Sequence, residues 1–416
     1  MVYPNAGMST VDDIKAKIDL ADYLREQGLV LKPAGTSFKA CCPFHNEKSP
    51  SFMVNREKQV WYCFGCSKGG DLFTFVQDRE GLEFAEALQL LADRAGVQLE
   101  QHDPRLEGKK TRSLALVELA VKWWHHQLLK TPQGEVARAY IAKRGIADAM
   151  VEQFALGYAP DAWDGLTTFL VSRKFSSQEM IEAGIALPGQ RTGGVYDRFR
   201  HRLVLPIHDL HGRIIGCTAR ILDGGKTVGP AGETPAKYVN TPETQLYKKG
   251  ATLYGLVFAK DVIRTKGYAI LVEGNMDALT SHEAGIANTV ATSGTALSAD
   301  QLRLLKRFTS VLHVAFDADP AGEGAAERGI DAALDAGFDV RVIRMPHGAD
   351  GTPLAKDPDE CIRKDVAAWK AATEHPIPVL DFYLERIRAT YDLRAPKGQG
   401  AAGQVLIAHL SHVSDP

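Results

Sequence analysis

The sequence lacks an apolar stretch long enough to form a membrane helix, which needs roughly 18 apolar residues in a row. Its first ten residues also lack the basic start and the apolar stretch of a secretion signal. No internal repeat of the length that builds solenoid proteins is present. These absences predict a folded protein that neither enters nor crosses a membrane.

A surplus of charge is missing as well, because 49 Lys and Arg nearly balance 51 Asp and Glu. Charged residues make up 24% of the chain and hydrophobic residues 45%, which excludes a disordered polyelectrolyte. The 416 residues suffice for two or three domains with cores of their own. The charges are unevenly spread, however, since residues 191–260 contain eleven Lys and Arg but only five Asp and Glu. A basic segment that precedes an acidic cluster indicates polyanion binding next to a metal site.

Cysteine is scarce, and four of the six cysteines lie within residues 41–66 together with a histidine. In a chain without a secretion signal, such crowding indicates a metal site rather than a disulfide framework. Two pairs of ligands share the same spacing, and two such turns can complete a tetrahedron around one structural Zn²⁺. The strand-like segments 51–55 and 59–62 between the pairs fit a zinc ribbon. Cys41 is a competing ligand, but Cys42 has the spacing that matches the second pair. The predicted zinc ligands are Cys42, His45, Cys63 and Cys66.

Aromatic and basic residues surround this predicted zinc site. Aromatic rings that stack on unpaired bases, next to lysines that follow phosphates, are typical of single-strand binding. For Phe52 and Phe64, this function and packing inside the ribbon are equally good interpretations. Trp61 fits the core better.

Strands and helices alternate in the second half of the chain. The hydrophobic pattern predicts strands at 268–272, 289–291, 311–316 and 340–345, and helices at 277–285, 299–307 and 321–337. This alternation is typical of a mostly parallel sheet covered by helices.

Carboxylates follow three of these predicted strands. Sites in parallel sheets lie where the strands end, and carboxylates gathered there would repel one another without a cation. Oxygen ligands suit Mg²⁺ or Mn²⁺, and two such ions can activate a 3′-hydroxyl and stabilise a leaving pyrophosphate. The first candidates for metal ligands are Glu273, Asp317 and Asp319. Three further carboxylates could be ligands or could hold the ligands in place, namely Asp277, Asp357 and Asp359.

The basic segment contains a row of alternating arginines. Arg198, Arg200 and Arg202 are expected to share one strand face, where guanidinium groups suit phosphate oxygens. The alternative is an ordinary solvated face, which three like charges without interleaved acids make less attractive. Further basic residues follow in the sequence, namely Arg220, Lys237, Lys248 and Lys249. The segment that begins at Asn240 is predicted to be a turn that could present amide and hydroxyl groups to a ribose.

These three elements, in this order, resemble the DnaG-type bacterial primases over nearly the whole chain. The resemblance lies in 42–52 and 63–71 for the zinc ribbon, 140–145 and 157–160 for the start of the RNA polymerase domain, 196–207 and 237–244 for its basic region, and Glu273-Gly-x-x-Asp277, Asp317-x-Asp319 and Asp357-Pro-Asp359 for its Toprim metal site. It implies a multidomain α+β and α/β fold: a zinc ribbon, a core that joins a mixed α+β subdomain to a parallel Toprim sheet, and C-terminal helices. The expected domains are a template-binding zinc ribbon at 1–103, a linker at 104–112, a basic subdomain at 113–258, a Toprim subdomain at 259–375, and a helical subdomain at 376–416 that stops as a truncated chain would.

The resemblance also implies an activity, that of a DNA primase within a primosome. Such a nucleotidyltransferase, a DNA-directed RNA polymerase, uses NTPs to make short RNA primers on single-stranded DNA for replication. It would use one structural Zn²⁺ and two or more Mg²⁺ or Mn²⁺, with catalysis by Glu273, Asp317 and Asp319. Template or NTP phosphates would be bound by Arg144, Arg198, Arg200, Arg220, Lys237, Asn240 and Lys249.

The implied partners are the template, NTPs, the replicative helicase and single-stranded DNA-binding protein. The protein is expected to be a monomer in the bacterial cytoplasm, at the nucleoid. The family's helicase-binding domain has no counterpart in the sequence, so helicase docking would need residues outside this chain.

Toprim sites also serve topoisomerases and nucleases. A topoisomerase needs a nucleophilic tyrosine in a strand-passage domain, and no segment is large enough for one. A nuclease would not need a basic strand for NTPs. Primer synthesis is the hypothesis that uses all three elements.

Overall fold

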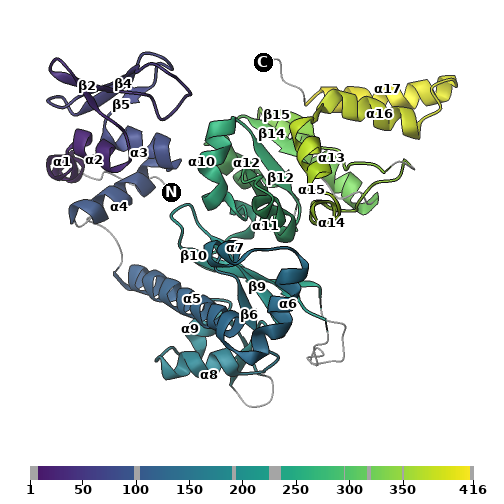
Figure 1. The fold of residues 1–416 in the computed structure, drawn as a ribbon, viewed down its shortest axis with the longest axis horizontal. Helices are drawn as coiled ribbons and strands as arrows, with labels where there is room; N and C mark the ends of the chain where they lie inside the picture. The colour runs from purple at the N-terminus through teal and green to yellow at the C-terminus, as the bar shows by residue number, and fades with distance from the viewer. Residues whose placement is uncertain are drawn as a thin grey trace. The chain divides into compact units, whose positions relative to one another are not determined.

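The computed structural model describes residues 8–97, 104–189, 194–223, 236–294, 296–315, 320–348 and 351–412, without the side chains of 8–10, 104–107 and 320–326. The chain divides into two compact units, Met1–Glu107 and Gly108–Pro416 (Figure 1). No helix within these described ranges combines the length and the hydropathy that a membrane span requires.

The first unit is an antiparallel sheet in the order β1-β2-β3-β4-β5 with helices beside it. Its core is aromatic: Phe52 and Trp61 stack with ring centroids 5.1 Å apart, and Phe75 meets both rings edge-on. Phe52 is 0% exposed and Trp61 2%, so both belong to the core, whereas Phe64 is 72% exposed. Of these three rings, Phe64 is the one exposed enough for a base to stack on it. The elements are α1 Met8–Lys17, α2 Leu20–Glu26, β1 Lys32–Ala34, β2 Ser37–Ala40, β3 Phe52–Asn55, β4 Val60–Cys63, β5 Gly69–Gly70, α3 Leu72–Glu80 and α4 Phe84–Ala95.

The second unit begins with an antiparallel sheet in the order β11-β10-β9-β6. The long helix α5 packs on its edge strand so closely that a side chain at Gly157 would meet the Trp124 Cβ at 2.6 Å. Residues 104–112, expected to form a linker, are part of this helix. The elements are α5 Pro104–Lys130, η1 Pro132–Gly134, α6 Glu135–Lys143, α7 Asp148–Gln153, β6 Gly157–Ala159, α8 Gly165–Ser172, α9 Ser177–Glu182, β7 Ala186–Pro188, β8 Val195–Asp197, β9 Arg202–His208, β10 Ile214–Ile221, β11 Tyr238–Asn240 and η2 Lys249–Ala251.

The prediction that Arg198, Arg200 and Arg202 share one strand face is wrong. Strand β8 ends at Asp197, strand β9 begins at Arg202, and His201 between them has a φ of 49°. The break has a physical cause, since the Asp197 carboxylate accepts the backbone N–H groups at the start of α8, both at 2.9 Å. Arg202 is buried and donates to backbone carbonyls, including that of Ala219 at 3.2 Å. It therefore stabilises the sheet from inside.

A second sheet follows, in the order β13-β12-β14-β15-β16. All neighbours are parallel except β16, which pairs antiparallel with β15. This confirms the predicted parallel sheet with helices between its strands. The elements are α10 Leu256–Lys266, β12 Ala269–Val272, α11 Asn275–Glu283, β13 Thr289–Ala291, α12 Ala299–Lys306, β14 Val311–Val314, α13 Pro320–Asp335, β15 Asp339–Val342, α14 Pro358–Lys364, α15 Val366–Glu374 and β16 Ile377–Pro378.

Two C-terminal helices, α16 Val379–Thr390 and α17 Pro396–Leu410, complete the second unit (Figure 1). They are joined to α13, because Asp331 accepts a hydrogen bond from the Tyr383 hydroxyl at 2.8 Å and pairs with His409 at 3.1 Å. The zinc-ribbon unit, the mixed core, the parallel sheet and these helices together confirm the expected fold class.

Candidate metal sites and basic surface

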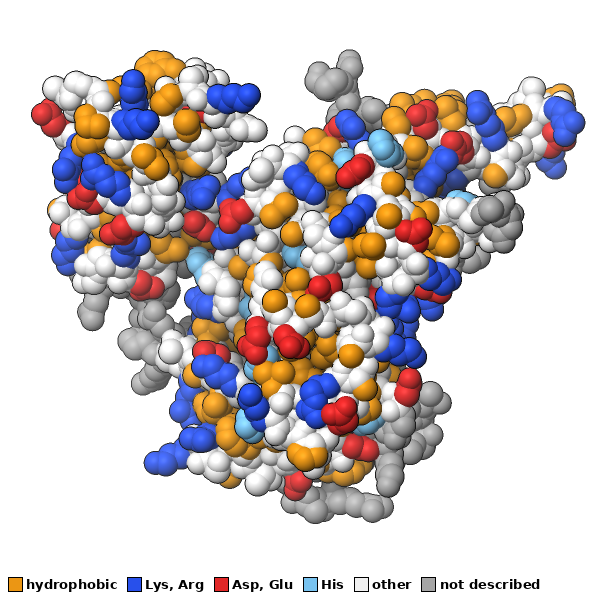
Figure 2. All heavy atoms as spheres, in the orientation of Figure 1, with side chains coloured by type: hydrophobic (Ala, Val, Ile, Leu, Met, Phe, Trp, Pro, Cys, Tyr) orange, Lys and Arg blue, Asp and Glu red, His pale blue; other side chains and the backbone are white. Residues whose placement is uncertain are grey.

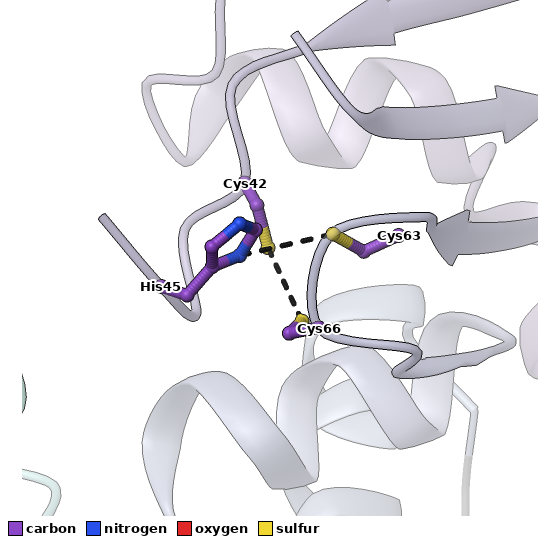
Figure 3. Close-up of side chains that lie close together, drawn as sticks. All are labelled: Cys42, His45, Cys63 and Cys66. Atoms are coloured by element: carbon purple, nitrogen blue, oxygen red, sulfur yellow. Dashed lines mark hydrogen bonds between the residues drawn. The ribbon is translucent and has the colours of Figure 1, made fainter. Parts of the chain in front are cut away.

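Four side chains from two turns of the first unit converge on one point (Figure 3). Their ligand atoms all lie within 4.8 Å of one another. The Cys42 and Cys66 sulfurs are 3.9 Å apart, close to the edge of about 3.8 Å of a tetrahedron with Zn–S bonds of about 2.3 Å. Cys41 is exposed and does not take part. The cluster consists of the predicted ligands Cys42, His45, Cys63 and Cys66.

A cation bound by the cluster of three cysteines and one histidine would stabilise its ionised thiols. Burial raises the pKa of the Cys42 thiol, and the neighbouring Cys63 adds to the effect. A thiol acts as a ligand in its ionised form, and a bound metal supplies the charge that favours that form. Three sulfurs and one imidazole nitrogen suit a structural Zn²⁺.

In the second unit, carboxylates gather where strand β12 ends. Asp277, in the first turn of α11, accepts the Gly274 N–H at 3.2 Å with one oxygen and the Asp359 N–H at 3.0 Å with the other. Glu273 immediately precedes this turn. Asp357 accepts the Glu360 N–H at 2.7 Å and so caps α14. The structure thus brings two of the three predicted segments, Glu273 to Asp277 and Asp357 to Asp359, to one edge.

The remaining two predicted metal ligands, Asp317 and Asp319, lie outside the described residues. The described chain leads toward the same edge, because β14 runs parallel to β12 and the Ala315 N–H donates to the Leu271 carbonyl at 2.9 Å. Strands β12 and β14 therefore end at the same edge of the sheet.

Asp359 is the most deeply buried member of this edge, with its side chain 5% exposed. One carboxylate oxygen, Oδ2, pairs with the Arg144 guanidinium and lies 3.4 Å from Arg363 Nη2. The other, Oδ1, is buried without a hydrogen-bond partner among the described residues. Such an oxygen costs free energy unless something satisfies it, and a hard cation is a suitable partner.

A basic surface adjoins this carboxylate. The Arg144 and Arg220 guanidinium groups lie over the ring of Tyr140, with distances to its centroid of 4.9 and 5.0 Å. Arg220 also donates to the Tyr238 hydroxyl at 3.2 Å, and Lys237 lies over the Tyr238 ring. Burial raises the pKa of Tyr140 to about 12, so the phenol stays neutral. In Figure 2 a group of Lys and Arg side chains marks the place where α6 approaches α14.

Sequence reasoning missed Tyr140, Tyr238 and Arg363, although each had a signal. Tyr140 precedes Arg144 by four residues and Arg363 follows Asp359 by four, the spacing that places side chains together on a helix. Tyr238 comes directly after Lys237, and Lys237 was already a candidate for phosphate binding.

The other predicted site residues of the basic segment make different contacts in the second unit. Arg200 stacks on Trp163 at 4.4 Å, and its Nη1 donates to the Asp197 carbonyl. Asn240 pairs with Thr218 across the sheet, and Lys249 starts η2. The last candidate is Arg198, which follows β8 and has a buried Nε without a partner in the described structure.

Comparison with known proteins agrees with this architecture. Three family descriptions match in order: a CHC2 zinc finger at residues 7–107, a DNA primase catalytic core N-terminal domain at 124–260 and a Toprim-like domain at 270–362. A crystal structure of the Aquifex aeolicus primase, with its zinc-binding and RNA polymerase domains, is 30% identical and covers 98% of this chain and 93% of that one, with a TM-score of 0.61. The chain belongs to the DnaG-type bacterial DNA primases.

Two further relatives define the extent of the similarity. A DNA primase of Clostridium acetobutylicum is 37% identical over 387 residues, which are 92% of this chain and 61% of that protein. The chain thus spans about six-tenths of the length of this curated relative. A structure of a DnaG primase catalytic domain bound to ssDNA is 31% identical, covers 74% of this chain and 92% of that one, and has a TM-score of 0.62.

Proposed function

We propose that this DnaG-type chain is a DNA-dependent RNA polymerase that makes short RNA primers on single-stranded DNA from NTPs. One observation carries the proposal: the buried pair of Arg144 and Asp359 joins the basic surface to the carboxylate edge. Phosphates held by the arginines would then lie beside the metal-binding oxygens. A site for nucleotidyl transfer needs this combination.

Glu273, Asp317 and Asp319 would hold Mg²⁺ or Mn²⁺, together with the unpartnered Oδ1 of Asp359. When bound, two or more such ions would favour ionisation of a 3′-hydroxyl and stabilise the leaving pyrophosphate. Asp277 and Asp357 act differently in this proposal. Their oxygens accept backbone N–H groups, so they fix the positions of the ligand-bearing segments.

The basic residues divide into two groups in this proposal. Arg144, Arg220 and Lys237 would bind NTP phosphates, with the guanidinium groups of Arg144 and Arg220 held over the Tyr140 ring. The second group would follow the template or the ribose and consists of Arg198, Arg200, Asn240 and Lys249. The similar catalytic domain that was solved with ssDNA supports a single-stranded template.

The zinc ribbon would help to select the initiation sequence, with exposed Phe64 available to stack on a base. One Zn²⁺ on Cys42, His45, Cys63 and Cys66 would hold its two turns together. The proposed domains are the zinc ribbon at 1–103, a helical linker at 104–112, the basic subdomain at 113–258, the Toprim subdomain at 259–375 and the helical subdomain at 376–416. As a primase, the protein would act as a monomer in the bacterial cytoplasm, with the replicative helicase and single-stranded DNA-binding protein.

One assay tests the proposal against its rivals. The chain is incubated with circular single-stranded DNA, labelled NTPs and Mg²⁺, and short RNA products are expected. Linearised single-stranded DNA without RNA would instead favour a nuclease, and relaxation of a supercoiled duplex plasmid in a parallel reaction would favour a topoisomerase. Asp317→Ala should abolish synthesis and leave DNA binding, measured by fluorescence anisotropy, unchanged. The matched control Asp300→Ala changes an exposed carboxylate in the first turn of α12 and should keep full activity. An active Asp317→Ala variant would refute the carboxylate assignment.

A further inference from the structure

Beside the proposed zinc ligands lies a carboxylate that is not a ligand itself. Glu47 is close to the first pair of ligands in sequence, yet its side chain is only 10% exposed. Buried carboxylates are retained where they are hydrogen-bonded or paired. The hydrogen-bond partners of Glu47 therefore indicate what this side chain does at the site.

Both oxygens of Glu47 are in use. Oε1 accepts the Cys42 N–H at 2.6 Å and the Ser51 N–H at 3.1 Å. Oε2 accepts the Ser51 hydroxyl at 2.6 Å and lies 3.2 Å from His45 Nε2. Every partner is a donor, so the position requires a group that accepts at both ends. A carboxylate does this and an amide does not.

The His45 ring is held between this carboxylate and the cysteines. Its Nδ1 lies 3.8 Å from the Cys63 sulfur, on the side of the ligand cluster (Figure 3). Its Nε2 lies 3.2 Å from Glu47 Oε2. Only an imidazole with its proton on Nε2 can donate to Glu47 and still offer the Nδ1 lone pair to a metal. Carboxylates that accept from a ligating histidine in this way fix the ring and increase its basicity.

Glu47 also reaches the second pair of ligands. The Ser51 hydroxyl that it binds is 3.1 Å from the Cys63 sulfur. Through Cys42, His45 and Ser51, one side chain thus touches or adjoins three of the four ligands.

We propose that Glu47 is the positioning residue of the zinc site: it selects the His45 tautomer and holds both ligand pairs at the spacing of the metal. The inference rests on the proposed ligand set, and it adds a residue whose own atoms do not bind the ion. Glu47→Gln is the sharpest change, because it keeps the shape and replaces one acceptor oxygen by a donor. That NH₂ group must then face either the two backbone N–H groups or the Ser51 and His45 donors.

The experiment measures zinc release from the full zinc-loaded chain to excess 4-(2-pyridylazo)resorcinol. Glu47→Gln should release zinc roughly 10- to 100-fold faster than the parent. The control Glu57→Gln, in the exposed turn between β3 and β4, should release it at the parental rate. Equal rates for the two variants would overturn the proposal.

A second readout separates positioning from a general loss of stability. Long-range ¹H–¹⁵N spectra of ¹⁵N-histidine-labelled chain should show a protected Nε2–H on His45 in the parent and rapid exchange of that proton in Glu47→Gln. If Glu47→Gln does not fold, Ser51→Ala is measured in its place. It should release zinc faster while its His45 Nε2–H stays protected, and an exchanging proton there would contradict the role of Glu47.

The ligand set is tested apart from Glu47. Cys63→Ser should lose stoichiometric zinc in the same assay. If Cys63→Ser kept its zinc, the proposed ligands would be wrong, and the effect of Glu47→Gln would have no meaning for them. If Cys63→Ser lost zinc and Glu47→Gln did not release it faster, the ligands would stand and the positioning role alone would fail.

Discussion

The backbone N–H of Asp359 donates a hydrogen bond to Asp277 Oδ1 at 3.0 Å, although 82 positions separate the two residues in the chain. The bond joins the start of α14 to the start of α11. Asp277 is 7% exposed, and its second oxygen accepts the Gly274 N–H. Asp277 therefore fixes the main chain next to Glu273 and next to Asp359 at the same time.

Asp277→Asn should loosen this joint. The asparagine has one acceptor oxygen, so its NH₂ group must face one of the two backbone N–H groups. A buried donor left without an acceptor costs about 1–3 kcal/mol. We expect a loss of stability of that size and faster hydrogen exchange of the α11 and α14 amides, measured by mass spectrometry. The amides of the exposed control Asp300→Asn should exchange at the parental rate. If the α11 and α14 amides of Asp277→Asn stayed as protected as in the parent, Asp277 would not hold the two helix starts together.

Arg144→Ala should destabilise the second unit strongly. The Arg144 side chain is 12% exposed and that of Asp359 5%, and removal of one partner from a buried ion pair costs about 3–5 kcal/mol. Urea unfolding without added Mg²⁺ measures the loss. The double variant Arg144→Ala/Asp359→Ala should be more stable than Arg144→Ala, because no buried carboxylate then remains with only the 3.4 Å contact to Arg363. A double variant that lost the sum of both single effects would show that the pair does not interact. Arg303→Ala, from an exposed pair, is the control and should cost less than about 1 kcal/mol.

The parallel sheet and its acidic edge could be predicted because both depend on local pattern. Apolar runs that alternate with helical periodicity fix the order of strands and helices, and parallel strands bring their ends to one edge. Glu273 and Asp359 therefore lie at one edge of the sheet for reasons visible in the sequence. The zinc ligands follow in the same way from spacing.

The arginine row could not be predicted correctly, because a contact distant in sequence decides it. Asp197 turns away from a strand to cap α8, and Arg200 stacks on Trp163. Likewise, alternation in the ribbon does not reveal that Phe52 faces α3 while Phe64 faces solvent. Tyr140 of α6 and Tyr238 of β11 join the site because both contact Arg220 of β10 in three dimensions.

The attachment of α17 should depend on pH through His412. Its hydrogen bond to Asp335, with Nδ1 2.7 Å from the carboxylate, raises the pKa of His412 above 6.5. Because the folded-state pKa is the higher one, the stabilisation is fully present below pH 6.5 and is lost as the pH rises through the folded-state value. We expect the last turn of α17 to exchange its amides faster at pH 8 than at pH 6, after correction for intrinsic exchange. In His412→Gln the corrected rates should not change with pH, and a persistent pH dependence there would point to another group.

Gly65→Ala should damage the zinc site although residue 65 supplies no ligand. A Cβ at this position would lie 2.5 Å from His45 Nε2 and 2.9 Å from the Ser51 hydroxyl oxygen, closer than such atoms approach. The methyl group would therefore push the imidazole out of the gap between Glu47 and Cys63. We expect the zinc content of the purified chain, measured by mass spectrometry of the metal, to fall well below one per chain or its release to become at least tenfold faster. Gly400→Ala, on α17 with no atom within 4 Å of the added Cβ, should keep full zinc. Parental zinc retention in Gly65→Ala would mean that the His45 ring can bind from another position, and the fixed geometry around Glu47 would then be wrong.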